Sequence, residues 1–341
     1  NEMMIMKRFF LLLFSLFTLV ALRAENKVSL TLIPPGKITN KVDLDIRGGI
    51  VNESAVQQTY QVSLYWGKEK KDALLYETTV TVPAGKSETV KVVISTKERV
   101  GKHKVIFKVA DADKIYRKTK DIEIIESDIR SIQQISGAWA GIYHWSEIEG
   151  KHWNQDIKKM TDDQWKEMMR SMNKLEMNMV VIQEVFRNEE YVGKRTSTID
   201  TYAGKAFYPS KLYPGRMDIT AEDPIEAILS EADKLGMNVL MGVGMFAWFD
   251  FTPESLEWHK RVAKELWDMY GHHESFYAFY VSEESGGGLD NWEQRPEMRK
   301  KRKDDIVNFF KEFKAYCNAL APDKPIMLAT NSFEVPNGMD T

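Results

Sequence analysis

The chain divides into two regions with different hydrophobic periodicity. From about residue 27 to residue 126, short runs alternate apolar and polar side chains, as expected for strands with one buried face. Turn residues such as Pro34-Pro35, Gly48-Gly49 and Pro83-Ala84-Gly85 separate these runs. After Ser127, uninterrupted apolar runs alternate with segments whose apolar residues recur every three to four positions. The first region therefore predicts strands alone, and the second predicts strands alternating with helices.

Six or seven short strands in roughly 100 residues are typical of an immunoglobulin- or fibronectin-like β-sandwich, which we predict for residues 25–127. This region has one histidine, His103, and its acidic residues alternate with lysines. A spacer or docking module is therefore the simplest interpretation of the sandwich. Its alternating apolar positions are Val42, Leu44 and Ile46; Tyr60, Val62, Leu64 and Trp66; Val80 and Val82; Val90 and Val92; Val105, Phe107 and Val109; and Ile122 and Ile124.

The helices of the second region carry explicit end signals. Thr161 and Gln164 have the spacing of a capping box. Asp223-Pro224 begins a second helix, which Gly236 ends, and Thr252-Pro253 begins a third, ending at Gly271. A fourth is predicted from about residue 296 to residue 320. The basic residues 299–303 precede acidic residues and indicate a solvated helix face.

The apolar runs between these helices are typical of parallel strands covered on both faces. Strand–helix alternation allows a doubly wound sheet or a (β/α)8 barrel. A doubly wound nucleotide-binding sheet needs a glycine-rich turn after its first strand, where this chain has Tyr143-His144-Trp145, so a TIM barrel is favoured for residues 134–341. The spacing predicts a barrel truncated after about strand five. The runs are Ile135–Tyr143, Met179–Val185, Asn238–Phe246, Phe276–Ser282 and Pro325–Ala329.

The N-terminal residues have the pattern of a secretory signal. Lys7 and Arg8 precede the apolar run Phe9–Leu22, and small residues, including Ala24, follow. The run is shorter than the roughly 18–20 residues that span a bilayer. An uncleaved anchor is the alternative. We predict that residues 1–24 are a signal peptide, that no membrane span remains after cleavage, and that the protein is periplasmic or secreted.

Composition excludes several classes of function. The 47 basic and 50 acidic residues leave a formal net charge of −3, which does not provide the positive field of a nucleic-acid binder. Cys317 is the only cysteine, so it forms no internal disulfide and no cysteine-based zinc site. The side chains of His272 and His273, as neighbours in the chain, are expected to diverge. We predict no metal and no cofactor.

Candidate chemistry lies just beyond each predicted strand, because barrel active sites form at the C-terminal strand ends. The strand Phe276–Ser282 leads into two adjacent carboxylates, of which alternation allows only one to face the barrel mouth. A carboxyl group held against aromatic rings has the raised pKa of a general acid. Glu284 is preferred and Glu283 is second, with two solvated loop acids as the alternative. The candidate substrate-binding residues are Tyr143, Trp145, Gln183, Glu184, Trp248 and Asn331.

Glycoside hydrolysis generally uses a second carboxylate about 5–10 Å from the first. Glu184 and Glu334 are candidates, and a later barrel strand is the other source. Trp145, Trp153, Trp248 and Trp292 either stack on sugar rings or pack in the core.

Several motifs of the second region resemble those of an uncharacterised family of glycosidase-type TIM-barrel proteins, a domain of unknown function found in secreted bacterial glycan-utilisation systems, often behind an immunoglobulin-like domain. The motifs are Met179–Gln183, Tyr208-Pro209-Ser210, Ala232–Val239 and Phe276–Glu284. The resemblance implies a barrel related to clan-A glycosidases, in which a strand-four glutamate is the acid/base. That role falls to Glu284, with Glu283 in reserve.

The leading hypothesis is a secreted or periplasmic glycoside hydrolase acting on a glycan, with Glu284 as general acid/base. The alternative is a non-catalytic carbohydrate-binding or surface-assembly protein on a TIM-barrel platform. A third hypothesis is a structural module that attaches through its sandwich.

Overall fold

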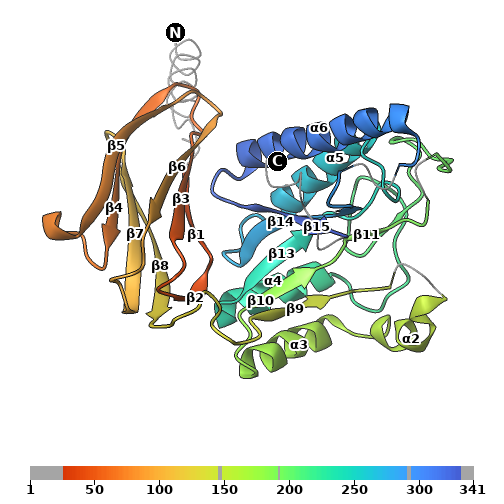
Figure 1. Cartoon of the computed structure of the whole chain (residues 1–341), viewed down its shortest axis with the longest axis horizontal. Helices are drawn as coiled ribbons and strands as arrows, with labels where there is room; N and C mark the ends of the chain where they lie inside the picture. The colour runs from red at the N-terminus through yellow and green to blue at the C-terminus, as the bar shows by residue number, and fades with distance from the viewer. Residues whose placement is uncertain (1–25, 145–147, 191–192, 290–292, 332–341) are drawn as a thin grey trace, which may run out of the picture.

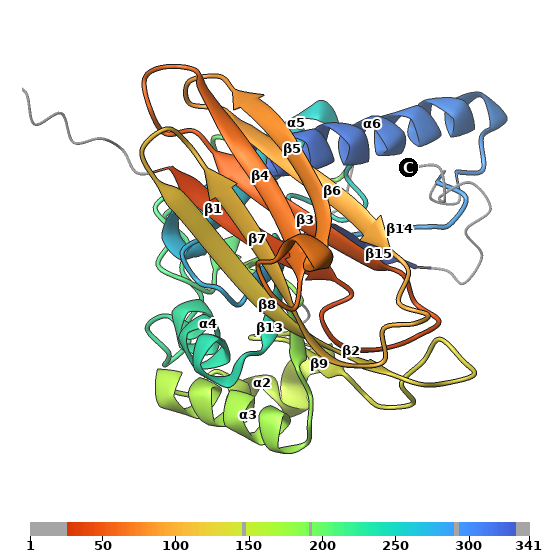
Figure 2. The ribbon, with the colours of Figure 1, turned by 90° about the vertical axis from the view of Figure 1, so that its left-hand side faces the viewer.

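A computed structural model describes residues 26–144, 148–190, 193–289 and 293–331. The first region forms two β-sheets, and the second forms a parallel sheet with helices, which lies beside them (Figure 1). Figure 2 shows the strands of the first region crossing in front of the parallel sheet. Among the residues described, none of the helices combines the length and apolar composition needed to cross a lipid bilayer.

The two sheets of the first region pack face to face through one shared apolar cluster. Neighbouring strands are antiparallel except β2 and β8, which run parallel. The smaller sheet contains β1 (Lys27–Ile33), β3 (Leu44–Val51) and β6 (Ser87–Ile94). The larger contains β2 (Gly36–Thr39), β8 (Ile115–Ile125), β7 (Gly101–Ala110), β4 (Gln58–Trp66) and β5 (Leu74–Val82), and the short helix η1 (Lys71–Ala73) joins β4 to β5.

Gly48 and Gly49 lie inside β3 instead of ending a strand as expected. A Cβ on Gly48 would overlap the ring of Phe107 from the opposite sheet, so the missing side chain lets that ring pack against the β3 backbone. A Cβ on Gly49 would lie 2.9 Å from Pro322 Cγ and 3.1 Å from Asp323 Oδ1. Both glycines therefore serve close packing, which an alternation pattern does not reveal.

The parallel sheet follows chain order without reversal. A doubly wound sheet changes direction at a switch point, whereas each strand here pairs with the next one along the chain. The strands are β9 (Gly137–Ala140), β10 (Met179–Ile182), β13 (Asn238–Gly242), β14 (Phe276–Ser285) and β15 (Ile326–Thr330). The longer helices are α3 (Asp162–Lys174), α4 (Pro224–Leu235), α5 (Pro253–Tyr270) and α6 (Pro296–Leu320), and the shorter ones are η2 (Glu149–His152) and α2 (Asn154–Ile157).

The predicted helix ends are confirmed at α3 and α4. Thr161 Oγ1 accepts from the Gln164 amide at 3.3 Å, and the Gln164 side chain accepts from the Thr161 amide at 2.9 Å, which completes the capping box. Asp223 caps α4 through the Glu226 amide at 3.0 Å. Gly236 ends that helix in the left-handed conformation with φ of 66°.

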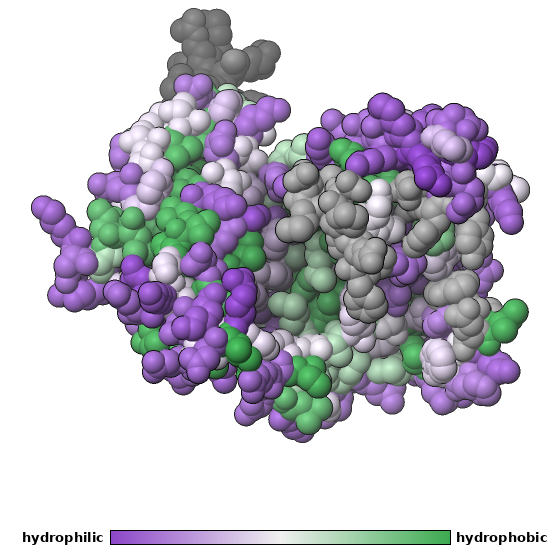
Figure 3. All heavy atoms as spheres, in the orientation of Figure 1, coloured by the Kyte–Doolittle hydropathy of each residue, from purple (hydrophilic) through white to green (hydrophobic). Residues whose placement is uncertain are grey.

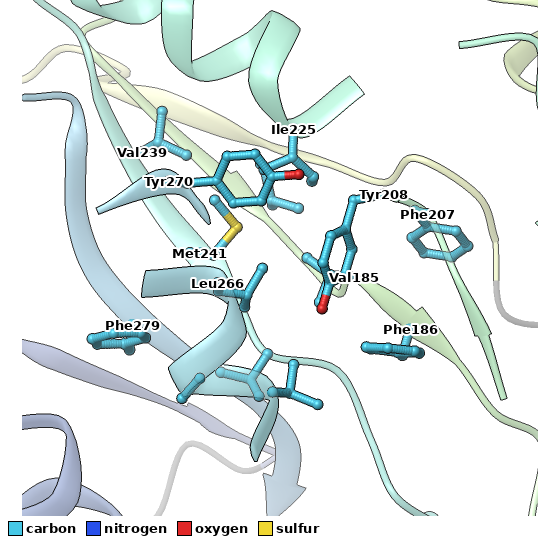
Figure 4. Close-up of a cluster of buried hydrophobic side chains, with 14 of the residues drawn as sticks. Val185, Phe186, Phe207, Tyr208, Ile225, Val239, Met241, Leu266, Tyr270 and Phe279 are labelled. Atoms are coloured by element: carbon cyan, nitrogen blue, oxygen red, sulfur yellow. The ribbon is translucent and has the colours of Figure 1, made fainter. Parts of the chain in front are cut away.

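The two faces of the parallel sheet have different coverings. The helices bury one face in a large apolar cluster, part of which Figure 4 shows around Tyr208, Tyr270 and Met241. The other face, which we call the open face because its apolar cluster contains no helix residue, carries a smaller buried cluster that includes Val181, Leu240, Ala278 and Tyr280. Hydrophilic residues gather over the outer side of α6, where Lys300–Asp304 and Lys301–Asp305 pairs confirm a solvated face (Figure 3).

The sandwich binds the N-terminal ends of the parallel strands through polar contacts. Asp323, directly before β15, accepts hydrogen bonds from Ser29 Oγ at 2.7 Å and Thr31 Oγ1 at 2.6 Å. The Tyr277 hydroxyl donates to the Leu32 carbonyl at 3.0 Å. A cavity of about 350 Å³ lies at this junction. The sandwich is therefore docked against the parallel sheet.

Residues 183–190 and 193–222, between β10 and α4, pack over the helix-covered side with little regular structure. Two short strands, β11 (Phe186–Arg187) and β12 (Lys205–Ala206), pair in an antiparallel manner. The hydroxyls of Tyr208 and Ser210 both donate to Glu265 Oε2 of α5 at 2.6 Å. These contacts fix the segment against α5.

Candidate functional site

Glu284 lies on the open face at the C-terminal end of β14. Tyr280 of the open face pairs with Met327, and Glu284 pairs with Ala329, two residues further along β15. Because side chains alternate along a strand, Tyr280 and Glu284 share a face. In agreement, the charge of Glu284 contributes, after burial, to a raised pKa of Tyr280. The β14–β15 register therefore directs this carboxyl away from the helix layer.

The Glu284 carboxyl is half-buried and held by one amide. Burial raises its pKa above the ordinary glutamate value. Asn331, just after β15, donates from Nδ2 to Glu284 Oε2 at 2.9 Å. The pair joins a carboxyl of raised pKa to a neutral donor that fixes its orientation.

Glu283 lies in the buried region on the helix-covered side. It is fully buried, and burial raises its pKa well above the usual range, although backbone N–H groups of Phe249 and Asp250 partly oppose the shift. Alternation along β14 places the two adjacent acids on opposite faces, and a register shift with β15 lies between Val281 and Glu284. The Ser282 hydroxyl donates to the Gln183 carbonyl at 2.6 Å and accepts from the Gly244 amide at 2.9 Å, which ties β14 to the segments after β10 and β13.

Glu184 shares the buried region of Glu283. Burial raises its pKa to about 8, and the charge of Arg187 only partly lowers it. Both glutamates add to the effect of burial in raising the pKa of Tyr202, whose hydroxyl donates to the Met245 carbonyl at 2.8 Å. Tyr202 belongs to the non-periodic segment, and no sequence pattern distinguished it. A polar groove of about 490 Å³ that includes Arg187 opens beside this region.

Asp250 is a third buried acid near this end of the sheet, and its charge is compensated. Arg195 donates to Asp250 Oδ2 at 2.9 Å and to Glu254 Oε2 at 2.6 Å. Thr252 donates to Asp250 Oδ1 through its hydroxyl at 2.6 Å and its amide at 3.0 Å. These contacts assign Asp250 to holding the loop before α5 in place.

The remaining predicted site residues are dispersed. Gln183 is exposed at the end of β10, and Asn331 is exposed beside Glu284. Tyr143 is buried, with the Arg187 guanidinium 5.4 Å from its ring centroid. Trp248 is partly buried, and its backbone amide donates to the Glu190 carbonyl at 2.7 Å.

Trp153 is 46% exposed, with its ring edge-on to His144. Trp145, Trp292 and Glu334 lie outside the described residues. Of the predicted site residues, the structure thus joins Glu284 with Asn331 by a direct hydrogen bond and places Glu184 with Glu283 in the buried region.

The fold and the site define an α/β protein with a parallel sheet wound in one direction, carboxyl groups at its C-terminal edge, and a pair of stacked β-sheets at the opposite edge. Residues 135–338 match a family described as Domain of unknown function (DUF4434), and the chain belongs to this family. No curated protein matches the chain.

Several solved glycosidase structures are distantly similar. The β-glucuronidase 2 of Bacteroides uniformis, covalently bound to cyclophellitol-6-carboxylate aziridine, is 11% identical with a TM-score of 0.35, over 89% of this chain and 33% of that one. The Parabacteroides merdae β-glucuronidase is 13% identical with a TM-score of 0.35, over 88% and 33%. The chain thus spans about a third of the length of these enzymes. Similarity at this level assigns no activity.

Proposed function

We propose that the protein is a glycoside hydrolase acting on a glycan, with Glu284 as the general acid/base. The observation that carries this proposal is the half-buried Glu284 carboxyl on the open face, with its pKa raised by burial and its orientation held by Asn331. A proton donor to a glycosidic oxygen needs such a raised pKa, so that it is still protonated when the substrate binds.

We also propose that the parallel sheet is part of a (β/α)8 barrel. Parallel strands in chain order, with helices on one face, are the arrangement of consecutive strands in a (β/α)8 barrel. We assign residues 134–341 to part of such a barrel, so that the open face becomes its interior and Glu284 lies at its mouth. We assign residues 25–127 to an immunoglobulin-like sandwich, and residues 1–24 to a signal peptide that directs the protein to the periplasm or outside the cell.

In the proposed reaction, the protonated Glu284 carboxyl donates its proton to the glycosidic oxygen as the bond from that oxygen to the anomeric carbon breaks. A water molecule supplies the hydroxyl group that bonds to the anomeric carbon, and its other proton restores the Glu284 carboxyl. Glu284 Oε2 accepts a hydrogen bond from the Asn331 amide. The proton that Glu284 donates is therefore carried on its other oxygen, Oε1. Glu184 and Glu283 share the buried region near Tyr202, and we assign neither as the second carboxylate.

The test is the full chain carrying Glu284→Gln, assayed for reducing-sugar release from a panel of polysaccharides. Loss of a general acid is expected to lower turnover by about 10²–10⁴-fold. Activity should also fall as pH rises through the raised pKa of Glu284. Glu167→Gln, on the exposed side of α3, is the matched control and should retain full activity. Equal turnover of Glu284→Gln and wild type would remove Glu284 from the mechanism.

One observation favours the alternative of a non-catalytic carbohydrate-binding or surface-assembly protein. Burial is the cause of the raised Glu284 pKa, and the acid whose pKa the Glu284 charge affects, Glu283, lies on the other face of β14 and not beside Glu284 on the open face. The alternative predicts saturable glycan binding by both wild type and Glu284→Gln, with no product from either.

A further inference from the structure

Two histidines and a glutamate meet near the N-terminal ends of the parallel strands, away from Glu284. His272 and His273 follow α5, and Glu226 lies in the first turn of α4. His273 Nε2 is 2.9 Å from Glu226 Oε2, and one potential ligand atom from each of the three residues lies within 4.8 Å of the others.

The expectation that adjacent histidines diverge is wrong here. The two ring centroids are 4.1 Å apart with an interplanar angle of 37°. Divergence applies to neighbours in a strand, but these residues lie in the turn between α5 and β14, where successive side chains can project to the same side.

Asp233 orients His273 from the opposite side of its ring. His273 Nδ1 is 2.7 Å from Asp233 Oδ2, and Asp233 Oδ1 accepts the Ser275 amide at 2.7 Å. A carboxylate on the far nitrogen is the usual outer partner of a metal-binding histidine, because it fixes the tautomer and directs the other nitrogen at the metal. His273 is buried, whereas His272 is exposed and Glu226 is partly exposed, so an ion can reach the site from solvent.

We propose that Glu226, His272 and His273 bind a zinc ion. Two imidazole nitrogens and one carboxylate oxygen are a common zinc ligand set, with the fourth tetrahedral position left to water. Without metal, a proton on His273 bridges Nε2 to Glu226. Zinc replaces that proton, which passes to solvent. The ion would join the first turn of α4 to the turn before β14, next to Glu274, which the sandwich contacts through Lys118 and Lys120.

The test is calorimetric titration of the chelator-treated full chain with zinc chloride. Wild type should bind one zinc ion, and zinc should raise its Tm. His272→Ala should abolish this binding and the Tm rise while leaving the far-UV circular dichroism unchanged, because His272 is exposed. Asp233→Asn should weaken binding about 10- to 100-fold.

His152→Ala, which removes another exposed histidine, is the matched control and should bind zinc like wild type. Two results would overturn the site: equal zinc affinity in wild type and His272→Ala, or an equal loss in His152→Ala. Both readouts are independent of glycan cleavage, so they remain informative whether or not Glu284 proves catalytic.

Discussion

Two carboxylates at the N-terminal end of the parallel sheet and two at its C-terminal end have different surroundings. At the N-terminal end, Asp323 accepts two hydroxyl groups of the sandwich and lies 3.4 Å from Lys324, and Glu274 binds two lysines. At the C-terminal end, Glu184 and Glu283 are buried without comparable compensation. Asp323 and Glu274 therefore fasten the two regions together, whereas the carboxyl groups of Glu184 and Glu283 have raised pKa values.

The pKa values express this difference. Burial acts to raise the pKa of Glu274, but the hydrogen bonds and charges of Lys118 and Lys120 outweigh it and lower that pKa to about 2. For Glu184 burial prevails, and the pKa rises to about 8. A buried carboxyl group without compensating partners lowers the stability of a protein. Such groups occur most often at functional sites.

The largest expected effect is at Asp323. Asp323→Ala leaves Ser29, Thr31 and the buried Lys324 ammonium without their partner, which should lower the free energy of unfolding by about 3–5 kcal/mol. Urea denaturation measures the change. Asp128→Ala, at an exposed position, is the control and should be near neutral. A loss below about 1 kcal/mol would mean that the two regions are not coupled through this carboxylate.

The next largest effect is expected at Glu184, near the C-terminal ends of the parallel strands, where a substitution should raise the free energy of unfolding. Because the folded-state pKa of Glu184 is about 8, above its unfolded value, the folded state binds the extra proton and wild-type stability falls as pH rises from about 4.5 to 8. Glu184→Gln removes this loss, so it should match wild type near pH 4 and exceed it by on the order of 3 kcal/mol at pH 7.

Denaturation curves at several pH values check this expectation. Glu98→Gln, at an exposed position in the first region, should follow wild type throughout. Parallel pH curves for wild type and Glu184→Gln would show that water or a cation compensates the Glu184 charge.

A smaller effect is expected at Glu274. Its side chain is 58% exposed, so Glu274→Gln should cost less than about 1 kcal/mol, and less still at high salt. Because its pKa is depressed, the wild-type contribution is present above about pH 4.3 and is lost as pH falls toward 2. Denaturation at low and high salt measures the difference; a cost that is independent of salt would contradict an electrostatic origin.

The smallest effect concerns Asn331. Asn331→Ala removes the hydrogen bond to Glu284 Oε2, which should shift the Glu284 pKa by less than about one unit, since such bonds contribute about 0.5–1.5 kcal/mol net. Carbon-13 NMR titration of the glutamate carboxyl groups measures it. Gln183→Ala is the control, and an equal shift in both variants would remove Asn331 from the environment of Glu284.

Local signals in the sequence predicted the helices and most strands well. The capping box at Thr161, the cap at Asp223 and the glycine end at Gly236 are short-range features, and each appears as expected. Gly271 ends α5 with φ of −65°, so that helix stops without the left-handed turn associated with glycine. Strands β1 and β2 were not among the predicted alternating runs. In β1 the apolar residues Val28, Leu30 and Leu32 do alternate with polar ones, whereas β2 has only four residues, too few for a pattern.

Long-range contacts were not predictable from the same signals. The buried region near Tyr202 depends on the non-periodic residues 183–190 and 193–222, which contact Glu265 of α5 and Asp162 of α3. The meeting of His273 with Glu226 and Asp233 joins residues about 40 positions apart. Alternation along β14 predicted that its two adjacent acids face opposite sides, but the full burial of Glu283 beside the Phe249-Asp250 backbone could not be predicted from the sequence.

Gly49 and Asp323 together bring the backbone of β3 within van der Waals reach of the loop before β15. Because the junction is closely packed and carries several hydrogen bonds, the sandwich is not free to rotate relative to the parallel sheet. Anything bound to its outer surface would be carried at a constant angle and distance from the far rim of the parallel sheet. The distance between a partner bound to the sandwich and the C-terminal ends of the parallel strands would then be fixed by the fold.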